Sequence, residues 1–175
     1  MNLNNKILAI YGSPAKSSFS SSLLDNHVNS LANKETPDII HCNLSQYNIS
    51  PCNGCGLCAT SGKCVINDDM QKFYPILENC KNIFISSPIY FSSLPSHLKA
   101  FIDRTQPLFW KKFSKNPERS GIVFLSAGSF YPGIFSPSIT ILRHFFNTIG
   151  IRYDRENSEF YFNTDTVPQK FGSIL

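Results

Sequence analysis

Short apolar runs alternate with amphipathic stretches along this chain. Apolar runs of strand length occur at 6–11, 38–44, 82–87 and 121–127, and a fifth is expected from near Ile151 towards Phe162. Between them, apolar residues recur at helical spacing over 23–31, 68–80, 95–105 and 136–149. This alternation predicts an α/β fold with right-handed crossovers onto a doubly wound, mostly parallel sheet. Ligands of such folds bind at the carboxyl ends of the strands.

Composition narrows the class of protein. The 175 residues suit a single domain over 1–175, and 42% of them are hydrophobic while only 16% are charged. The net charge of +4 is spread without runs, which argues against a nucleic-acid-binding face. No apolar run approaches the roughly 18–20 residues that span a bilayer, and the first residues lack the pattern of a signal peptide. We therefore expect a cytoplasmic protein with no membrane partner, in which the six cysteines are not a disulfide framework.

The loop after the first apolar run is rich in hydroxyl groups. It reads GSPAKSSFSS over 12–21 and leads directly into a predicted helix, so its backbone N–H groups and hydroxyls would meet at the positive end of that helix. This arrangement suits a phosphate, although the loop is neither a Walker loop nor G-x-G-x-x-G. The alternative is a polar loop that only caps the helix. The candidate phosphate ligands are Ser13, Lys16, Ser18, Ser20 and Ser21.

Two further loops follow the third and fourth apolar runs and should lie at the same edge of the sheet. One, over 87–95, combines prolines, small residues and two aromatic residues, and the other is Ser-Ala-Gly-Ser over 126–129. A planar ring could lie between them, although the aromatic side chains could equally serve core or interface packing. The candidate ring-contacting residues are Pro88, Ile89, Tyr90, Phe91, Ser92, Ser93, Ala127 and Gly128.

Four of the six cysteines fall within thirteen positions. Cys52, Cys55, Cys58 and Cys64 form C-x2-C-x2-C-x5-C with three glycines between them, a spacing that can ligate a [4Fe–4S] cluster. Three alternatives stay open: a zinc site, free thiols on a loop, and a disulfide within the loop. The other two, Cys42 and Cys80, lie in apolar patterns and are expected in the core.

Five motifs occur in an order that resembles the NADPH-dependent FMN reductase family, and more narrowly its iron–sulfur flavoprotein branch. They are IYGSP over 10–14, PCNGC over 51–55, GKCVINDDM over 62–70, SPIYF over 87–91 and KAFIDR over 99–104. The resemblance implies a flavodoxin-like sheet of five parallel strands ordered 2-1-3-4-5, with helices on both faces. It also implies FMN bound by its phosphate at the first loop and by its ring at the other two.

The chain departs from the family pattern in two regions. Ala15 stands where the family usually has a basic residue, and Ser18 and Phe19 stand near a usual Gly and Asn, which puts side-chain phosphate contacts at Ala15 and Phe19 in doubt. The closing helix of the family is expected to be short or absent, because only thirteen residues follow Phe162.

The resemblance implies an FMN-dependent oxidoreductase that passes electrons from NAD(P)H to a small acceptor such as a flavin or quinone, as a homodimer or homotetramer. FMN would carry the chemistry, so no catalytic side chain is assigned. If the cysteines hold a cluster, the protein would instead relay single electrons from a ferredoxin-like donor to FMN. A non-catalytic redox-sensing module is the third interpretation. Asp68 and Asp69 are expected to cap a helix, and Asp103 with Arg104 to form an ion pair at a subunit contact.

Overall fold

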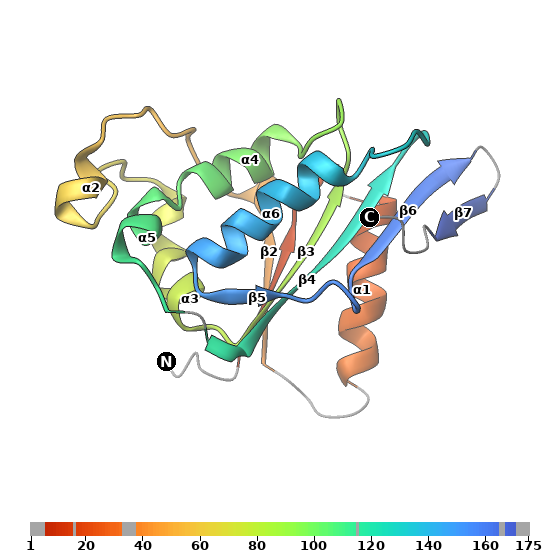
Figure 1. Cartoon of the computed structure of the whole chain (residues 1–175), viewed down its shortest axis with the longest axis horizontal. Helices are drawn as coiled ribbons and strands as arrows, with labels where there is room; N and C mark the ends of the chain where they lie inside the picture. Colours follow the sequence, from red (N-terminus) through yellow and green to blue (C-terminus); the bar gives the residue numbers. More distant parts are fainter. Residues whose placement is uncertain (1–5, 16, 33–37, 115, 165–166, 171–175) are drawn as a thin grey trace.

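The protein is built on one twisted β-sheet, shown in Figure 1. The computed structural model describes residues 6–15, 17–32, 38–114, 116–164 and 167–170. The strands are β1 Ile7–Tyr11, β2 Ile39–Asn43, β3 Asn82–Pro88, β4 Asn116–Ala127, β5 Ile151–Tyr153, β6 Glu159–Thr164 and β7 Val167–Lys170. The α-helices are α1 Phe19–Ala32, α2 Leu57–Ser61, α3 Tyr74–Asn79, α4 Ser96–Asp103, α5 Gln106–Lys111 and α6 Ser136–Thr148; the 3₁₀ helices are η1 Leu44–Gln46 and η2 Asp69–Lys72.

The predicted parallel order is confirmed, with its fifth position filled by two short strands. The sheet runs β2-β1-β3-β4-β6-β7, and β5 also pairs with β4. β5 and β6 are both parallel to β4, whereas β7 adds an antiparallel edge that was not predicted. A turn separates β5 from β6, in which the Asp154 carboxylate accepts the Asn157 N–H and the Ser158 hydroxyl accepts the Val123 N–H. The sequence prediction ran a single strand across 151–162, although the polar residues 154–158 between its two apolar stretches mark this turn.

A bulge shapes the start of β4. The pairing with β5 shifts register between Asn116 and Ser120, where Pro117 cannot donate to the ladder. Arg119 is buried there and its guanidinium donates to the carbonyls of Leu77, Cys80 and Ile149, at the ends of α3 and α6. Buried hydrogen bonds from Arg119 therefore join the start of β4 to the ends of α3 and α6.

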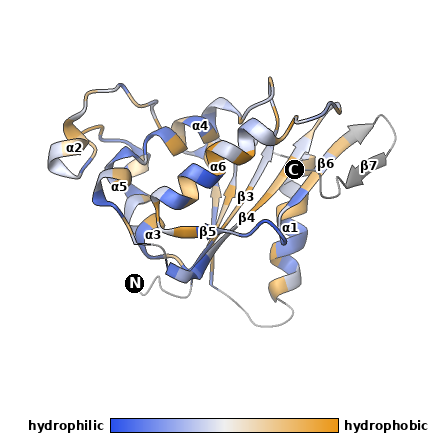
Figure 2. Ribbon diagram, in the orientation of Figure 1, coloured by the Kyte–Doolittle hydropathy of each residue, from blue (hydrophilic) through white to orange (hydrophobic). Residues whose placement is uncertain are grey.

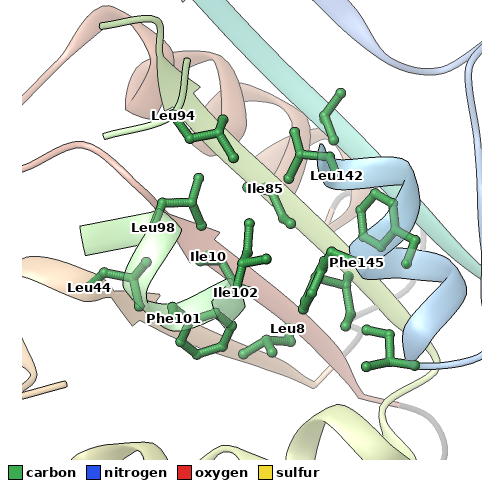
Figure 3. Packing of buried hydrophobic residues seen from close by; sticks show 14 of the residues in the cluster. Leu8, Ile10, Leu44, Ile85, Leu94, Leu98, Phe101, Ile102, Leu142 and Phe145 are labelled. Atoms are coloured by element: carbon green, nitrogen blue, oxygen red, sulfur yellow. The ribbon is translucent and has the colours of Figure 1, made fainter. Parts of the chain in front are cut away.

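Helices cover both faces of the sheet, as predicted, but unequally. α1 packs against β3, β4 and β1 on one face, around Leu24, Val28 and Phe84. The larger core lies on the other face beneath α3, α4 and α6, and Figure 3 shows Leu98, Phe101 and Phe145 packed there against the strands. In Figure 2 apolar residues occur along the strands, whereas the helices alternate between apolar and polar residues. Cys42 and Cys80 belong to the larger core as predicted, and burial raises the pKa of Cys42 to about 12 and that of Cys80 to about 11.

Two helical predictions need adjustment. The periodic segment 68–80 is split into η2 and α3, because Pro75 begins a new helix rather than continuing the first. In the described segments after α6, 149–164 and 167–170, no helix follows, as expected for a short or absent closing helix. Within the described part of the chain, every helix is too short or too polar to traverse a bilayer. That 1–175 forms a single domain stays a prediction.

Candidate functional site

The carboxyl ends of three neighbouring strands bring the predicted cofactor loops to one edge of the sheet. Tyr11 at the end of β1 pairs with Ser86 of β3, and Pro88 at the end of β3 pairs with Ser126 of β4. The three loops that follow these strands therefore begin side by side. This is the edge at which doubly wound sheets bind their ligands.

Three of the predicted phosphate ligands form a hydroxyl cluster at the start of α1. The Oγ of Ser18 lies 2.8 Å from the Oγ of Ser21 and 3.2 Å from the Oγ of Ser20. Ser18 is the N-cap of α1, since its Oγ accepts the N–H of Ser21. The cluster combines neutral donors with the positive end of a fourteen-residue helix that has no acidic residue in its first turn. It suits a phosphate dianion.

Two other residues of the first loop, Gly12 and Ser13, have mainly structural roles. Ser13 is buried, and its Oγ accepts the N–H of Ala15, which shapes the turn. Gly12 lies so close to α4 that an added Cβ would be 2.7 Å from Cδ2 of Leu98. Lys16, the remaining predicted ligand, lies outside the described residues. Ser86 faces α1 beneath this loop, and its buried Oγ has no hydrogen-bond partner among the described residues.

The loop after β3 contains a tight turn with two strained residues. Tyr90 and Ser93 exchange backbone hydrogen bonds of 2.9 Å, and the two residues between them, Phe91 and Ser92, adopt φ values of 48° and 63°. Two consecutive residues with positive φ define a type I′ turn, which normally contains Gly or Asn. The turn fully exposes the Phe91 side chain and half-exposes Tyr90. Backbone strain and exposed aromatic rings at a strand end are consistent with a ligand-binding role.

The loops after β3 and β4 contact each other. The Ile89 N–H donates to the Ser126 carbonyl at 2.7 Å, and the hydroxyls of Ser92 and Tyr131 form a hydrogen bond. Tyr131 and its neighbour Phe130 are exposed aromatic residues that were not among the sequence candidates. Their position directly after a buried strand was the signal that could have identified them. The loops thus place four exposed aromatic side chains near the predicted ring site.

Ala127 and Gly128 have different roles at the end of β4. The Ala127 side chain is buried in the larger core, so only its backbone is available to a ligand. Gly128 is exposed, and a Cβ added to it would meet nothing within 4 Å. Neither packing nor a positive φ requires glycine at this position. The absence of a side chain there leaves room for a ligand beside the backbone.

We expect Ser92→Gly to stabilise the protein by about 0.5–1 kcal/mol, because relief of the positive-φ strain at the tip of the turn, about 1–2 kcal/mol, outweighs the entropy that glycine adds to the unfolded chain. Urea unfolding of both proteins measures the difference. Ser93→Gly is the control, since Ser93 has no positive φ and the substitution should lower stability. A less stable Ser92→Gly protein would mean that the hydroxyl contact with Tyr131 outweighs the strain.

The four clustered cysteines lie on a loop that leaves the end of β2. The loop encloses α2, a short helix bounded by Gly56 and Gly62, whose φ values of 73° and 66° require glycine. Cys58 lies on α2, whereas Cys52, Cys55 and Cys64 lie on the flanking segments. Cys52 and Cys55 are exposed and the other two are half-buried. Sequence reasoning missed α2 because its apolar pattern is too short to be recognised.

The four thiols influence one another electrostatically. Burial raises the pKa of Cys58, and the charges of Cys64, Cys52 and Cys55 raise it further. Across the described ranges, no three His, Cys, Asp or Glu side chains are already gathered around a metal-binding position. The donor set nevertheless suits an iron–sulfur cluster in type and number, because such clusters are held by cysteine thiolates and four cysteines lie on this one loop.

The base of this cysteine loop is fastened by an ion pair. Arg104, just after α4, is 1% exposed and its guanidinium binds both carboxylate oxygens of Asp68 at 2.7 and 3.0 Å. Asp68 caps η2 as expected, accepting the Met70 N–H. The expectation for Asp103 and Arg104 was wrong, because Asp103 instead pairs with Lys99 and the partner of Arg104 lies within the same chain. The separation of 36 positions between Asp68 and Arg104 hides this pairing from sequence inspection.

The cysteine loop and the three strand-end loops are separate within one chain. Figure 1 shows α2 beyond α4 and α5, whereas the loop after β3 and the loop between β4 and α6 rise at the other end of α4 and α6. The structure therefore brings together the phosphate and ring candidates along one edge, and it does not bring the cysteines to them.

Both the sequence and the fold of this chain are similar to those of known proteins. The chain is 33% identical over 102 residues to an iron–sulfur flavoprotein of Archaeoglobus fulgidus, a match over 58% of this chain and 46% of that protein. The chain spans about half the length of the curated relatives it matches. Its fold is similar to that of an FMN-dependent NADH-azoreductase from Bacillus anthracis solved with FMN (TM-score 0.65, 18% identity, 90% of this chain and 86% of that one). It is also similar to that of an NAD(P)H:quinone oxidoreductase from Methanothermobacter marburgensis (TM-score 0.65, 14% identity, 91% and 83%).

The sequence profile of the NADPH-dependent FMN reductase family matches residues 5–130. This segment contains the serine cluster, the cysteine loop and the turn after β3. Because it covers well over half of the chain, the protein belongs to the NADPH-dependent FMN reductase family.

Proposed function

We propose that this protein binds FMN at the three strand-end loops and uses it to pass electrons from a reduced nicotinamide to a small acceptor such as a flavin or quinone. The observation that carries the proposal is the hydroxyl cluster of Ser18, Ser20 and Ser21 at the positive end of α1. The cluster lies at the same edge of the sheet as the strained turn after β3 and as Gly128 after β4. Phosphate donors and a ring slot at one edge suit a flavin mononucleotide.

The chain would hold the two ends of FMN by different means. The hydroxyls of Ser18, Ser20 and Ser21, with Ser13 and Lys16 as further candidates, would bind the phosphate. The loop from Pro88 to Ser93 and the backbone at Ala127 and Gly128 would hold the ring. FMN, when bound, supplies hydride acceptance and electron donation. The backbone donors of the two ring loops would stabilise negative charge on the ring, and the exposed aromatic residues would limit the access of water.

Ser20→Ala tests the phosphate assignment. Ser20 is fully buried and its hydroxyl lies 3.2 Å from that of Ser18, so its loss should displace the Ser18 hydroxyl from the phosphate and weaken FMN binding about tenfold, equivalent to about 1.4 kcal/mol. Flavin fluorescence titration of the apoprotein gives the dissociation constant. Ser22→Ala is the matched control, because Ser22 is exposed on the same helix and its hydroxyl donates to the Phe19 carbonyl. Equal affinity of all three proteins would place the phosphate elsewhere.

The cysteine loop supports a second candidate function, a relay of single electrons from a ferredoxin-like donor through a [4Fe–4S] cluster to FMN. Cys52, Cys55, Cys58 and Cys64 would be the ligands, and the names of the curated relatives favour this candidate. The cluster would supply one-electron transfer. Because the cysteine loop and the flavin loops are separate in one chain, a homodimer or homotetramer would bring the two sites together across a subunit contact.

The visible spectrum of protein purified without oxygen separates the candidates. Flavin bands without iron support the reductase, whereas an added brown shoulder with about four irons per chain supports the relay. Zinc in place of iron would support a structural site. A colourless protein that cannot be loaded with FMN would contradict both proposals. Flavin that is bound but never reduced by NADH, NADPH or reduced ferredoxin would favour a sensing module.

A further inference from the structure

Four exposed apolar side chains lie away from the proposed flavin site. Among the described residues, nine large apolar side chains are exposed. Five of them adjoin the strand-end loops: Phe19, Tyr90, Phe91, Phe130 and Tyr131. The other four, which we call the α5 patch, are Leu57 on α2, Val65 on the cysteine loop, and Phe109 and Trp110 on α5. The proposed FMN site gives the α5 patch no role.

The α5 patch is built on neighbouring elements. The rings of Phe109 and Trp110 meet edge to face with their centroids 5.3 Å apart, and each side chain is about half exposed. α5 contacts α2, and Figure 1 shows the two helices side by side at one end of the molecule. Single apolar residues are common on protein surfaces, whereas a group that includes two aromatic rings marks an interaction site. The α5 patch therefore predicts a partner.

Positive charge accompanies the α5 patch. The segments 51–67 and 105–114 contain three lysines, Lys63, Lys111 and Lys112, and no acidic residue. Glu78 of α3 neutralises Lys111 in an ion pair, whereas Lys63 and Lys112 are exposed and form no ion pair within the described parts of the chain. A partner that covers the apolar centre is therefore best matched when its own rim is acidic.

A cavity beside the patch favours a protein partner over a flat membrane surface. It has a volume of about 340 Å³ and lies between α3, α5 and the cysteine loop, with Leu108, Lys63 and Lys111 among its lining residues. A side chain of a partner protein can enter such a recess, which a lipid surface cannot follow. The two lysines suit an acidic side chain in that position.

We infer that the α5 patch is the docking surface for a small acidic electron-transfer protein, the ferredoxin-like donor of the second candidate function. The inference rests on that candidate for the identity of the partner, and not on any arrangement of the cysteines. Electron-transfer proteins form small, transient contacts that opposite charges guide, and a small apolar patch with unpaired lysines suits such a contact. A second copy of this chain is a poorer match, because a two-fold contact would bring Lys63 and Lys112 of one copy towards those of the other.

The first test titrates the wild-type protein, purified without oxygen, with an acidic ferredoxin that contains no tryptophan. Calorimetry should give a micromolar dissociation constant that weakens about tenfold when the salt concentration rises from about 0.05 M to about 0.5 M. Trp110 is the only tryptophan of the chain, so its emission maximum should shift to shorter wavelength as the ferredoxin binds. No binding, or binding that leaves this emission unchanged, would overturn the inference.

The iron content of the same sample separates the inference from the function on which it rests. Protein that contains iron but does not bind the ferredoxin contradicts the docking surface and leaves the relay intact. Protein without iron that binds the ferredoxin with a shift of the Trp110 emission contradicts the relay and supports the docking surface.

Charge reversal locates the contact. Lys63→Glu should weaken ferredoxin binding about tenfold at low salt, because it replaces an attraction at the rim of the patch with a repulsion. Arg143→Glu is the matched control, since Arg143 is exposed on α6, outside the patch, and the change in net charge is the same. Its dissociation constant should stay within about twofold of the wild-type value. Equal weakening in the two variants would mean that net charge alone governs binding, which would overturn the inference.

Two other occupants of the patch are tested directly. Trp110→Ser should weaken ferredoxin binding about tenfold at both salt concentrations and leave the sedimentation coefficient of the protein alone unchanged. A smaller assembly in this variant would assign the α5 patch to a second copy and overturn the inference. A shift of the Trp110 emission on addition of phosphatidylserine vesicles would assign the patch to a membrane surface, with the same consequence.

Discussion

Asp68→Asn will lower the free energy of unfolding by about 3–5 kcal/mol. Asp68 and Arg104 have 4% and 0% of their side-chain surfaces exposed, so the substitution leaves a buried guanidinium without its counter-charge. The carboxylate also accepts the backbone N–H groups of Ser50 and Met70, which an amide can satisfy only in part. Urea unfolding at pH 7 measures the loss.

Asp103→Asn is the matched control. It breaks the ion pair between Asp103 and Lys99, which both lie on α4 and are about two-fifths exposed. The free energy of unfolding should therefore change by no more than about 0.5 kcal/mol. Equal losses in the two variants would show that burial does not govern these pairs.

The contribution of Asp68 depends on pH. Burial raises its pKa, but the Arg104 guanidinium and the N–H groups of Ser50 and Met70 outweigh that effect and hold it below its ordinary value. A depressed pKa in the folded protein contributes stability above the unfolded pKa of about 3.9, and that stability is lost as the pH falls through the folded value. The difference between wild type and Asp68→Asn should therefore be constant near neutrality and shrink below about pH 4.

Gly121→Ala will destabilise the protein by about 3 kcal/mol. An added Cβ would lie 2.4–2.7 Å from three carbons of the Phe146 ring, which is fully buried and packed against Phe145 and Tyr153. The backbone cannot retreat easily, because the Gly121 carbonyl accepts the Asp154 N–H at 2.8 Å. Overpacking of this kind forces a core ring from its position. Urea unfolding again gives the value.

Gly128→Ala, seven positions further along the chain, should affect FMN binding rather than stability. Its Cβ would enter open space, so we expect unfolding to be unchanged while FMN binding weakens. The pair of variants thus separates a glycine required by packing from one reserved for a ligand. Tight FMN binding by Gly128→Ala would contradict the proposed position of the ring.

The elements of the fold could be predicted from the sequence wherever apolar residues recur with a clear period. β1 is an unbroken apolar run, and α6 places Ile139, Leu142 and Phe146 at helical spacing, so both were predicted nearly to their ends. The turn between β5 and β6 is marked by the polar run 154–158, and it was missed because the apolar stretches on either side were joined into one predicted strand.

The candidate site could be predicted only in the part that depends on local sequence. The proximity of Ser18, Ser20 and Ser21 follows from their position at a helix start, which is local information. The turn at Phe91 and Ser92 was not foreseen, because neither residue favours positive φ and only the surrounding structure enforces it. The role of Arg104 depends on a contact across 36 residues, which a single sequence does not reveal.

The two proposed cofactor regions share one rigid element. α4 begins at Ser96, just after the strained turn, and ends beside Arg104, which fastens the cysteine loop. Leu98, Phe101 and Ile102 hold the helix against the larger core along this path. An inserted residue would turn everything beyond it by about 100° and advance it by about 1.5 Å, which would carry the guanidinium away from Asp68. The length of α4 therefore determines how the turn after β3 and the base of the cysteine loop are positioned relative to each other.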